Sequence, residues 1–310
     1  KYTKDNLVFI PNDYIPKIKE YAYTNHSSLF EESIYQFVKN IYSDKINRNT
    51  RRIISPYELD VYIPDKKVAI ECNGLYYHST NHGVSKYYHL MKTEKCAEQG
   101  IRLIHINEWE WYNRKEICKS IIAGALGIFD ERLYARKCSI QEVNLDNSKD
   151  FLEKNHIQGY VPSSYRLGLF YKDELVQIVT IGKSRFKEGE WELLRMCTKL
   201  NTQVIGGFSK LLHHIPKEYK EIVSFVDRGK FTGKGYYSAG WEYVSNSAPN
   251  YHYFLGSKRY TRNQCQKHKL KSFLGEENFD PELTEMQNML NNGFLQLFDC
   301  GNIKVRYKIK

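Results

Sequence analysis

Two short runs of β-forming residues, 57–63 and 67–73, are joined by the turn residues Pro64-Asp65-Lys66, and this pattern constrains the fold most. Such runs on either side of a tight turn predict a β-hairpin. Helical periodicity is expected at 28–43, 85–100 and 113–129, and a further buried strand at 101–108. A helix, a hairpin, a helix, a strand and a helix in about a hundred residues predict an α/β layer sandwich.

The predicted hairpin carries one acidic residue on each strand, Asp60 and Glu71. Two carboxylates on paired strands can project to the same side of a sheet, where oxygen ligands suit Mg²⁺, with Mn²⁺ as a substitute. A bound metal ion would activate water and stabilise a phosphodiester transition state. The alternative is that both carboxylates face solvent on an amphipathic hairpin.

Two aromatic residues and a histidine, Tyr76-Tyr77-His78, follow the second strand. Loops that follow a strand often carry functional residues. Aromatic rings there could stack on bases or wedge between them. His78 could act as a general base near neutral pH, and its alternative role is that of a hydrogen-bonded structural histidine. A zinc site is only weakly indicated, because no cysteine has a suitable spacing.

Residues 28 to about 112 resemble the very-short-patch-repair (Vsr) endonuclease fold and, more closely, the EDxHD homing endonucleases of phages. Both belong to the PD-(D/E)xK nucleases. The resemblance implies that Glu31 is the family's helix glutamate, Asp60 its metal-binding aspartate and His78 its catalytic histidine. It also implies that Tyr76 and Tyr77 stand where Vsr carries its intercalating pair.

Two positions depart from these families. Asn73 stands where the superfamily has a lysine, and Lys92 stands where the closing acidic residue is expected. His89 lies one helical turn before Lys92 on the same face. Either Lys92 or His89 could supply the missing contact to phosphate.

Residues 138–256 show a second pattern, with a hairpin at 165–186, a strand at 190–200 and a glycine turn, Gly206-Gly207, that leads into a helix. This order resembles the GNAT (N-acetyltransferase) fold, which places Gly206-Gly207 near the acyl-CoA pyrophosphate turn. A tight strand-to-helix turn explains the two glycines equally well. We therefore expect a GNAT-like shape with a role in DNA contact, and no bound acyl-CoA.

The chain carries a net charge of +10 and 25 tyrosines among 310 residues, which favours a polyanionic partner. We expect double-stranded DNA, contacted at the following residues: Asn73, Tyr76, Tyr77, His89, Lys183, Arg185, Arg228, Lys258, Arg259, Arg262, Lys267 and Lys269. A C2 homodimer would cut both strands, a monomer would nick one, and the sequence leaves both open.

Seven cysteines without a CxxC pair argue against a disulfide framework and indicate a cytoplasmic protein, and no apolar run is long enough for a membrane helix. The predicted parts are an extension at 1–27, a nuclease domain at 28–133 and a GNAT-like α+β domain at 134–310. The predicted activity is metal-dependent DNA cleavage, with Glu31, Asp60, Glu71, His78 and Lys92 as catalytic residues. Two alternatives stay open: a GNAT-type acyltransferase or DNA-base modifier, and a DNA-binding protein with a decayed nuclease core.

Overall fold

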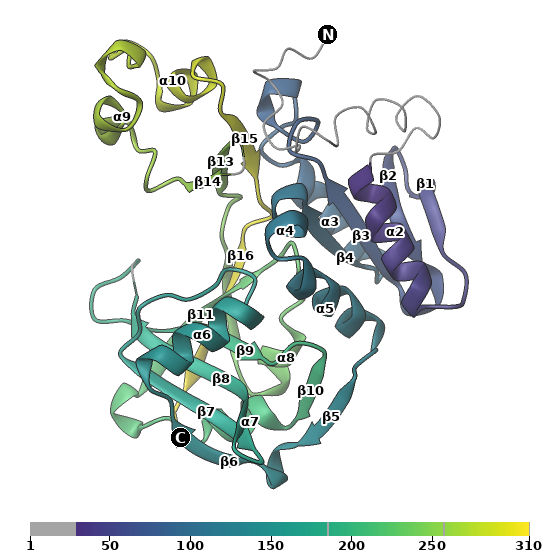
Figure 1. Ribbon diagram of the computed structural model, residues 1–310, viewed down its shortest axis with the longest axis vertical. Coiled ribbons are helices and arrows are strands. Elements are labelled where there is room, and N and C mark those ends of the chain that lie inside the picture. The colour runs from purple at the N-terminus through teal and green to yellow at the C-terminus, as the bar shows by residue number, and fades with distance from the viewer. Residues whose placement is uncertain (1–28, 185, 257, 310) are drawn as a thin grey trace. The chain divides into compact units, whose positions relative to one another are not determined.

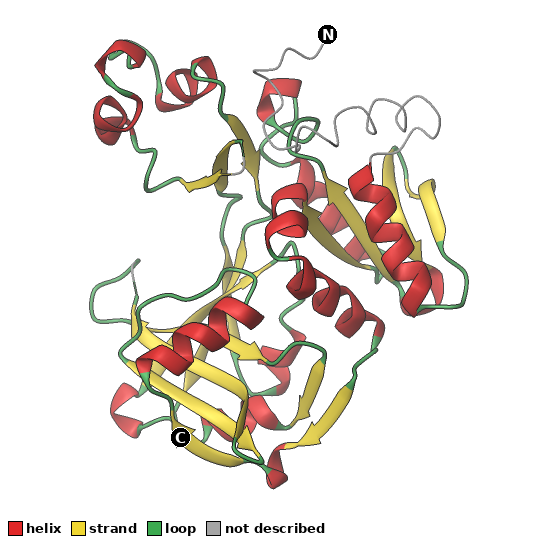
Figure 2. Ribbon diagram, in the orientation of Figure 1, coloured by secondary structure: helices red, strands yellow, loops and turns green. Residues whose placement is uncertain are grey.

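The computed structural model describes residues 29–184, 186–256 and 258–309. They form a mixed α/β fold with several sheets and helices (Figures 1 and 2). The chain divides into two compact units, and neither is continuous in sequence. Unit 1 runs to Asn113 and resumes at Ala248–Gly301, whereas unit 2 comprises Arg114–Ser247 and Asn302–Lys310. These bounds differ from the predicted division at residue 134, because residues 248–301 pack with the N-terminal part of the chain.

A four-stranded sheet in the order β1-β2-β3-β4 forms the centre of unit 1. The predicted hairpin is present: β2 and β3 pair antiparallel with Val61 opposite Ile70, while β4 runs parallel to β3. Helix α2 lies in front of this sheet in Figure 1 and α3 behind it. The bounds are α2 Leu29–Ile41, β1 Asn47–Ile54, β2 Tyr57–Ile63, β3 Val68–Asn73, α3 Tyr88–Glu98, β4 Arg102–Asn107 and α4 Glu108–Asn113.

Both faces of this sheet are apolar, because α2 and α3 each bring a hydrophobic side to it. Helix α2 buries Phe30, Ile34 and Val38. Cys96 of α3 packs with Tyr62, Leu103 and their neighbours. A sheet covered on both sides needs nearly continuous apolar strands, and all six residues of β3 are buried.

Residues 248–301 add a three-stranded antiparallel sheet in the order β14-β13-β15 to unit 1. A small core centred on Tyr253, Leu270 and Phe294 joins this sheet to its two helices. Thr284 begins the second of them with a capping box that includes Gln287. The bounds are β13 Tyr251–Leu255, β14 Lys258–Thr261, α9 Lys267–Leu274, α10 Glu285–Asn291 and β15 Leu295–Phe298.

Unit 2 contains a seven-stranded sheet in the order β12-β16-β11-β9-β8-β7-β6, and a separate parallel pair, β10 with β5. Neighbouring strands of the seven-stranded sheet run antiparallel, except β9 and β11, which run parallel. The chain that connects β9 to β11 includes α7. The strand bounds are β5 Glu131–Tyr134, β6 Ser139–Glu142, β7 Tyr165–Tyr171, β8 Glu174–Lys183, β9 Trp191–Thr198, β10 Thr202–Ile205, β11 Glu221–Asp227, β12 Glu242–Asn246 and β16 Asn302–Lys308.

Helices cover both faces of the seven-stranded sheet. Phe151 and Leu152 of α6 pack with Ile178 and Cys197, whereas Leu211 of α7 belongs to the larger cluster. The helix bounds are α5 Lys115–Leu126, α6 Leu145–Asn155, α7 Gly207–Leu212 and α8 Lys234–Ser238. None of the helices in the described ranges is long and apolar enough to cross a membrane.

Candidate functional site

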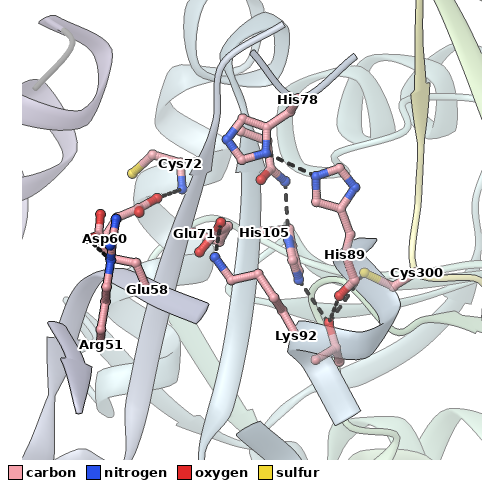
Figure 3. A network of polar contacts seen from close by, with 12 residues as sticks. Arg51, Glu58, Asp60, Glu71, Cys72, His78, His89, Lys92, His105 and Cys300 are labelled. Atoms are coloured by element: carbon pink, nitrogen blue, oxygen red, sulfur yellow. Dashed lines mark hydrogen bonds and ion pairs between the residues drawn. The ribbon is translucent and has the colours of Figure 1, made fainter. Parts of the chain in front are cut away.

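The predicted acidic pair of unit 1 comes together with Lys92 inside the protein (Figure 3). Val61 of β2 is paired with Ile70 of β3. Asp60 directly precedes Val61, and Glu71 directly follows Ile70. Lys92, from α3, donates a hydrogen bond to Glu71 Oε1, and both side chains are at most 2% exposed. The cluster therefore holds two carboxylates and one ammonium group.

The hydrogen bonds of this cluster occupy one oxygen of each carboxylate. Glu71 Oε1 accepts from Lys92, and Asp60 Oδ2 accepts from the backbone N–H of Cys72. Burial, with Glu71 nearby, raises the pKa of Asp60 well above its ordinary range, although Lys92 partly opposes this. The described ranges contain no group of three or more His, Cys, Asp or Glu side chains that could hold a metal ion.

His78 lies at the start of a hydrogen-bonded chain through His89 to the segment 248–301. His78 Nδ1 is 3.1 Å from His89 Nε2, and His89 Nδ1 is 2.9 Å from the carbonyl oxygen of Phe298. The two ring planes are nearly parallel, with an interplanar angle of 14°. Burial lowers the pKa of His78 to about 3 and that of His89 to about 4, so both rings are neutral at pH 7.

A second chain of hydrogen bonds begins at Asn73, on the strand that carries Glu71. Asn73 Nδ2 is 3.1 Å from His105 Nδ1, and His105 Nε2 is 2.8 Å from Thr93 Oγ1. Asn73 Nδ2 is the donor to the ring, because an amide nitrogen only donates. Asn73, predicted to bind DNA, thus supports the interior of unit 1.

Glu31, the remaining predicted catalytic residue, pairs with Arg48. The distance from Glu31 Oε1 to Arg48 Nη2 is 3.2 Å. The adjacent residue Glu32 also pairs with Arg48, with 2.7 Å between its Oε2 and Arg48 Nη1. Burial raises the pKa of Glu31, and Arg48 partly offsets that rise. Arg48 is therefore a direct partner of Glu31.

The aromatic residues after β3 stay at the surface. The ring centroids of Tyr76 and Tyr77 are 5.2 Å apart in an edge arrangement, and Tyr77 is 66% exposed. Tyr76 also packs on His82 at 3.7 Å between centroids. Thr80, in the same loop, donates to Gln296 of β15 at 3.3 Å, so the segment 248–301 supports this loop.

The basic residues predicted to contact DNA are divided between the units. Unit 1 carries Lys258 and Arg259 on β14, Arg262 after it, and Lys267 and Lys269 on α9. Lys183 and Arg228 belong to unit 2. Arg185 lies outside the described residues. The predicted set is therefore not one cluster within either unit.

Unit 2 has a feature that the sequence did not indicate, two parallel strands whose pairing ends early. Strands β9 and β11 pair only at Trp191–Ile222 and Glu192–Val223. At the next position, Ser224 Oγ donates to the carbonyl oxygen of Leu193 at 3.0 Å. The Ser224 side chain thus takes the place of a backbone hydrogen bond at the point where the pairing of the two strands ends.

Tyr236 of α8 contacts Ser224 at the end of the β9–β11 pairing. Its hydroxyl is 3.3 Å from Ser224 Oγ and acts as the donor, because the Ser224 proton is directed to Leu193. Burial raises the pKa of Tyr236, and the Ser224 hydrogen bond only partly opposes this. No spacing in the sequence identifies Ser224 and Tyr236 as partners, because the packing of α8 against β11 brings them together.

The predicted glycine turn lies where β10 meets α7. Gly206 has φ of +76°, which favours glycine. A Cβ atom on Gly207 would lie 2.1 Å from Gln177 Oε1 and 2.8 Å from Val204 Cγ1. Close packing against β8 therefore explains Gly207 without any ligand.

Comparisons with known proteins were made by sequence and by structure. No protein-family model matches the chain, and no curated protein matches it. Solved acetyltransferases resemble it. One is an acetyltransferase of Bacillus subtilis in complex with CoA, with 13% identity, 56% of this chain and 100% of that chain covered, and a TM-score of 0.33. Another is a GNAT family acetyltransferase of Elizabethkingia anophelis with acetyl-CoA bound, with 14% identity, 56% and 99% coverage, and a TM-score of 0.33.

These findings correct the predicted activity. Both similar structures are acetyltransferases with CoA or acetyl-CoA, and neither is an EDxHD or Vsr-like nuclease. Neither structure supports the predictions of a metal-dependent endonuclease, of Mg²⁺ or Mn²⁺ and of no acyl-CoA. In unit 1, Lys92 holds one oxygen of Glu71 and a backbone amide holds one oxygen of Asp60. A TM-score of 0.33 by itself assigns no activity to this chain.

Proposed function

We propose that unit 2 transfers an acyl group from acyl-CoA, at the place where β9 and β11 cease to pair. The sequence resemblance of residues 138–256 to N-acetyltransferases supplies the substrate class. The observation that carries the proposal is that backbone pairing of the parallel strands ends after Glu192 and Val223. Beyond this point the facing strand edges do not pair with each other. An extended ligand with amide groups could take the place of the missing ladder.

Tyr236 has the chemistry that the leaving group requires. When an amine attacks the thioester carbonyl, a C–N bond forms, the C–S bond breaks and the amine gives up a proton to solvent, from which the Tyr236 phenolate regains one afterwards. The departing thiolate takes up a proton, which the phenol of Tyr236 can donate. Its raised pKa keeps this phenol protonated at neutral pH. Ser224 fixes the hydroxyl at the point where the strand pairing ends.

Calorimetric titration of the full chain with acetyl-CoA tests the proposal. Saturable heat and a raised melting temperature are expected. If neither appears, the proposal is wrong. Thiol release from acetyl-CoA with a panel of primary amines then tests the role of Tyr236. We expect Tyr236→Phe to keep binding and to lower thiol release by roughly 10²- to 10⁴-fold. Tyr237→Phe is the matched control, because Tyr237 is the exposed neighbour on the same helix.

We propose nucleic-acid binding by unit 1 as a second candidate function. The specific observation in its favour is the exposed Tyr77, on a loop supported by the sheet that carries Lys258 and Arg259. An aromatic face stacks on bases, and cations contact phosphates. Double-stranded DNA is the expected partner. Binding to labelled DNA over a range of salt concentrations tests this function separately from acyl transfer.

A further inference from the structure

The two histidines in unit 1 form a directed hydrogen-bond chain whose donors and acceptors can be assigned. A carbonyl oxygen only accepts, so Nδ1 of His89 must donate to Phe298. The pKa of His89 is lowered to about 4, chiefly by burial, so the ring is neutral at pH 7 and carries one proton. Its Nε2 is then an acceptor, and His78 Nδ1 must be the donor across the 3.1 Å contact. The remaining nitrogen of His78, Nε2, consequently carries a lone pair.

We propose that the segment 248–301 sets the tautomer of His78 through His89, so that His78 Nε2 is an unprotonated atom ready to accept a hydrogen bond from a ligand. Phe298 and His89 are positioning groups in this arrangement, because they act through His78. The ligand class is a hydrogen-bond donor. This inference is independent of acyl transfer, which we place in unit 2.

Two further acceptor atoms in the same unit support this ligand class. Glu71 Oε2 and Asn73 Oδ1 are buried and have no hydrogen-bond partner among the described residues. Both side chains come from β3, two positions apart, and therefore project to the same side of the sheet. Glu71 and Asn73 are 1% and 6% exposed. An unsatisfied buried acceptor is costly, and a donor ligand or an ordered water would satisfy it.

The groups around His78 keep it neutral. Burial comes first in lowering its pKa, and His89 and Lys92 lower it further. Both of these neighbours belong to α3, as does Tyr88, whose ring centroid is 6.2 Å from that of His78. A neutral imidazole whose second nitrogen holds a fixed hydrogen bond presents a defined acceptor nitrogen.

Nitrogen NMR of the full chain, labelled with ¹⁵N-histidine, tests the proposal at neutral pH. Long-range proton–nitrogen correlations distinguish the two tautomers of a neutral ring. We expect a proton on Nδ1 of both His78 and His89, and none on Nε2 of either. A proton on Nε2 of either ring would overturn the assignment, and this result needs no variant.

The variant His89→Phe tests the positioning role. The ring of Phe fills the site but cannot accept from His78, so we expect a population of His78 with the proton on Nε2 to appear. His82→Phe is the matched control, because His82 contacts Ser79 and Tyr76 and is not in the chain. An unchanged His78 tautomer in His89→Phe would show that His89 only fills space. If this variant does not fold, the wild-type spectrum still decides the proposal.

Discussion

Lys92 of α3 and Glu71 of β3 form an ion pair inside unit 1 that solvent hardly reaches. Burial lowers the pKa of Lys92, but Glu71 and Asp60 more than offset this, so the pKa is raised and the ammonium group stays charged. A buried charge that loses its partner is strongly destabilising. The pair thus couples the helix to the sheet at the position where the sequence had predicted a metal ion.

Replacing Lys92 with methionine should lower the free energy of unfolding by about 3–5 kcal/mol, because Glu71 would stay buried without a counter-charge. Urea denaturation measures the change. The double variant Lys92→Met with Glu71→Leu should recover much of the loss, since no charge is then left unpaired. Equal instability of the single and double variants would show that packing, and not the charge pair, is the cause.

Asp60→Asn should stabilise unit 1 at neutral pH. Because the folded-state pKa of Asp60 is raised, the folded protein holds this proton more tightly than the unfolded chain does. Stability therefore falls as pH rises from the ordinary value of 3.8 through the raised folded value. Asparagine can still accept from Cys72 N–H and has no charge to bury. A gain on the order of 1 kcal/mol per unit of pKa shift is expected, and unfolding measured from pH 4 to 8 checks it.

His89→Phe should reduce the loss of stability in acid. The folded pKa of His89 is about 4 against an ordinary 6.5, so the unfolded chain takes up this proton first as pH falls. The contribution is present above 6.5 and is lost as pH falls toward 4. At pH 5 the loss from this one group is about 2 kcal/mol. Part of the acid sensitivity should remain in the variant, since burial also lowers the pKa values of His78 and His156.

Gly207→Ala should destabilise unit 2 by about 1–3 kcal/mol, because its Cβ would collide with the buried amide of Gln177. Adding Gln177→Ala should relieve part of that collision. Thermal unfolding of the two single variants and the double variant forms the test. A fully additive double variant would contradict the collision, since independent sites add and contacting sites do not.

Tyr77→Ala should weaken DNA binding by about 1–3 kcal/mol if its ring stacks on a base. Tyr243→Ala is the control, because Tyr243 is 57% exposed and belongs to unit 2. Arg262→Gln should reduce the slope of log affinity against log salt by about 1 if the side chain contacts a phosphate. Fluorescence anisotropy at several salt concentrations measures both. Equal losses in Tyr77→Ala and Tyr243→Ala would rule out a specific stacking site.

The sequence by itself determined the local elements of this protein. The turn at Pro64-Asp65-Lys66 predicted the hairpin that brings Asp60 beside Glu71, and the pattern at 165–186 predicted the β7–β8 hairpin. These features depend on contacts between residues close in the chain, which periodicity and turn chemistry report directly.

Only the tertiary structure decided what those residues contact. Lys92 reaches Glu71 from a helix, Phe298 meets His89 across 209 positions, and Ser224 meets Tyr236 because α8 packs against β11. The return of residues 248–301 to unit 1 had no signal in composition or spacing. Such contacts depend on how distant elements pack, and a single sequence reports distant packing poorly. The same two carboxylates that predicted a metal site therefore turned out to hold a lysine and a backbone amide.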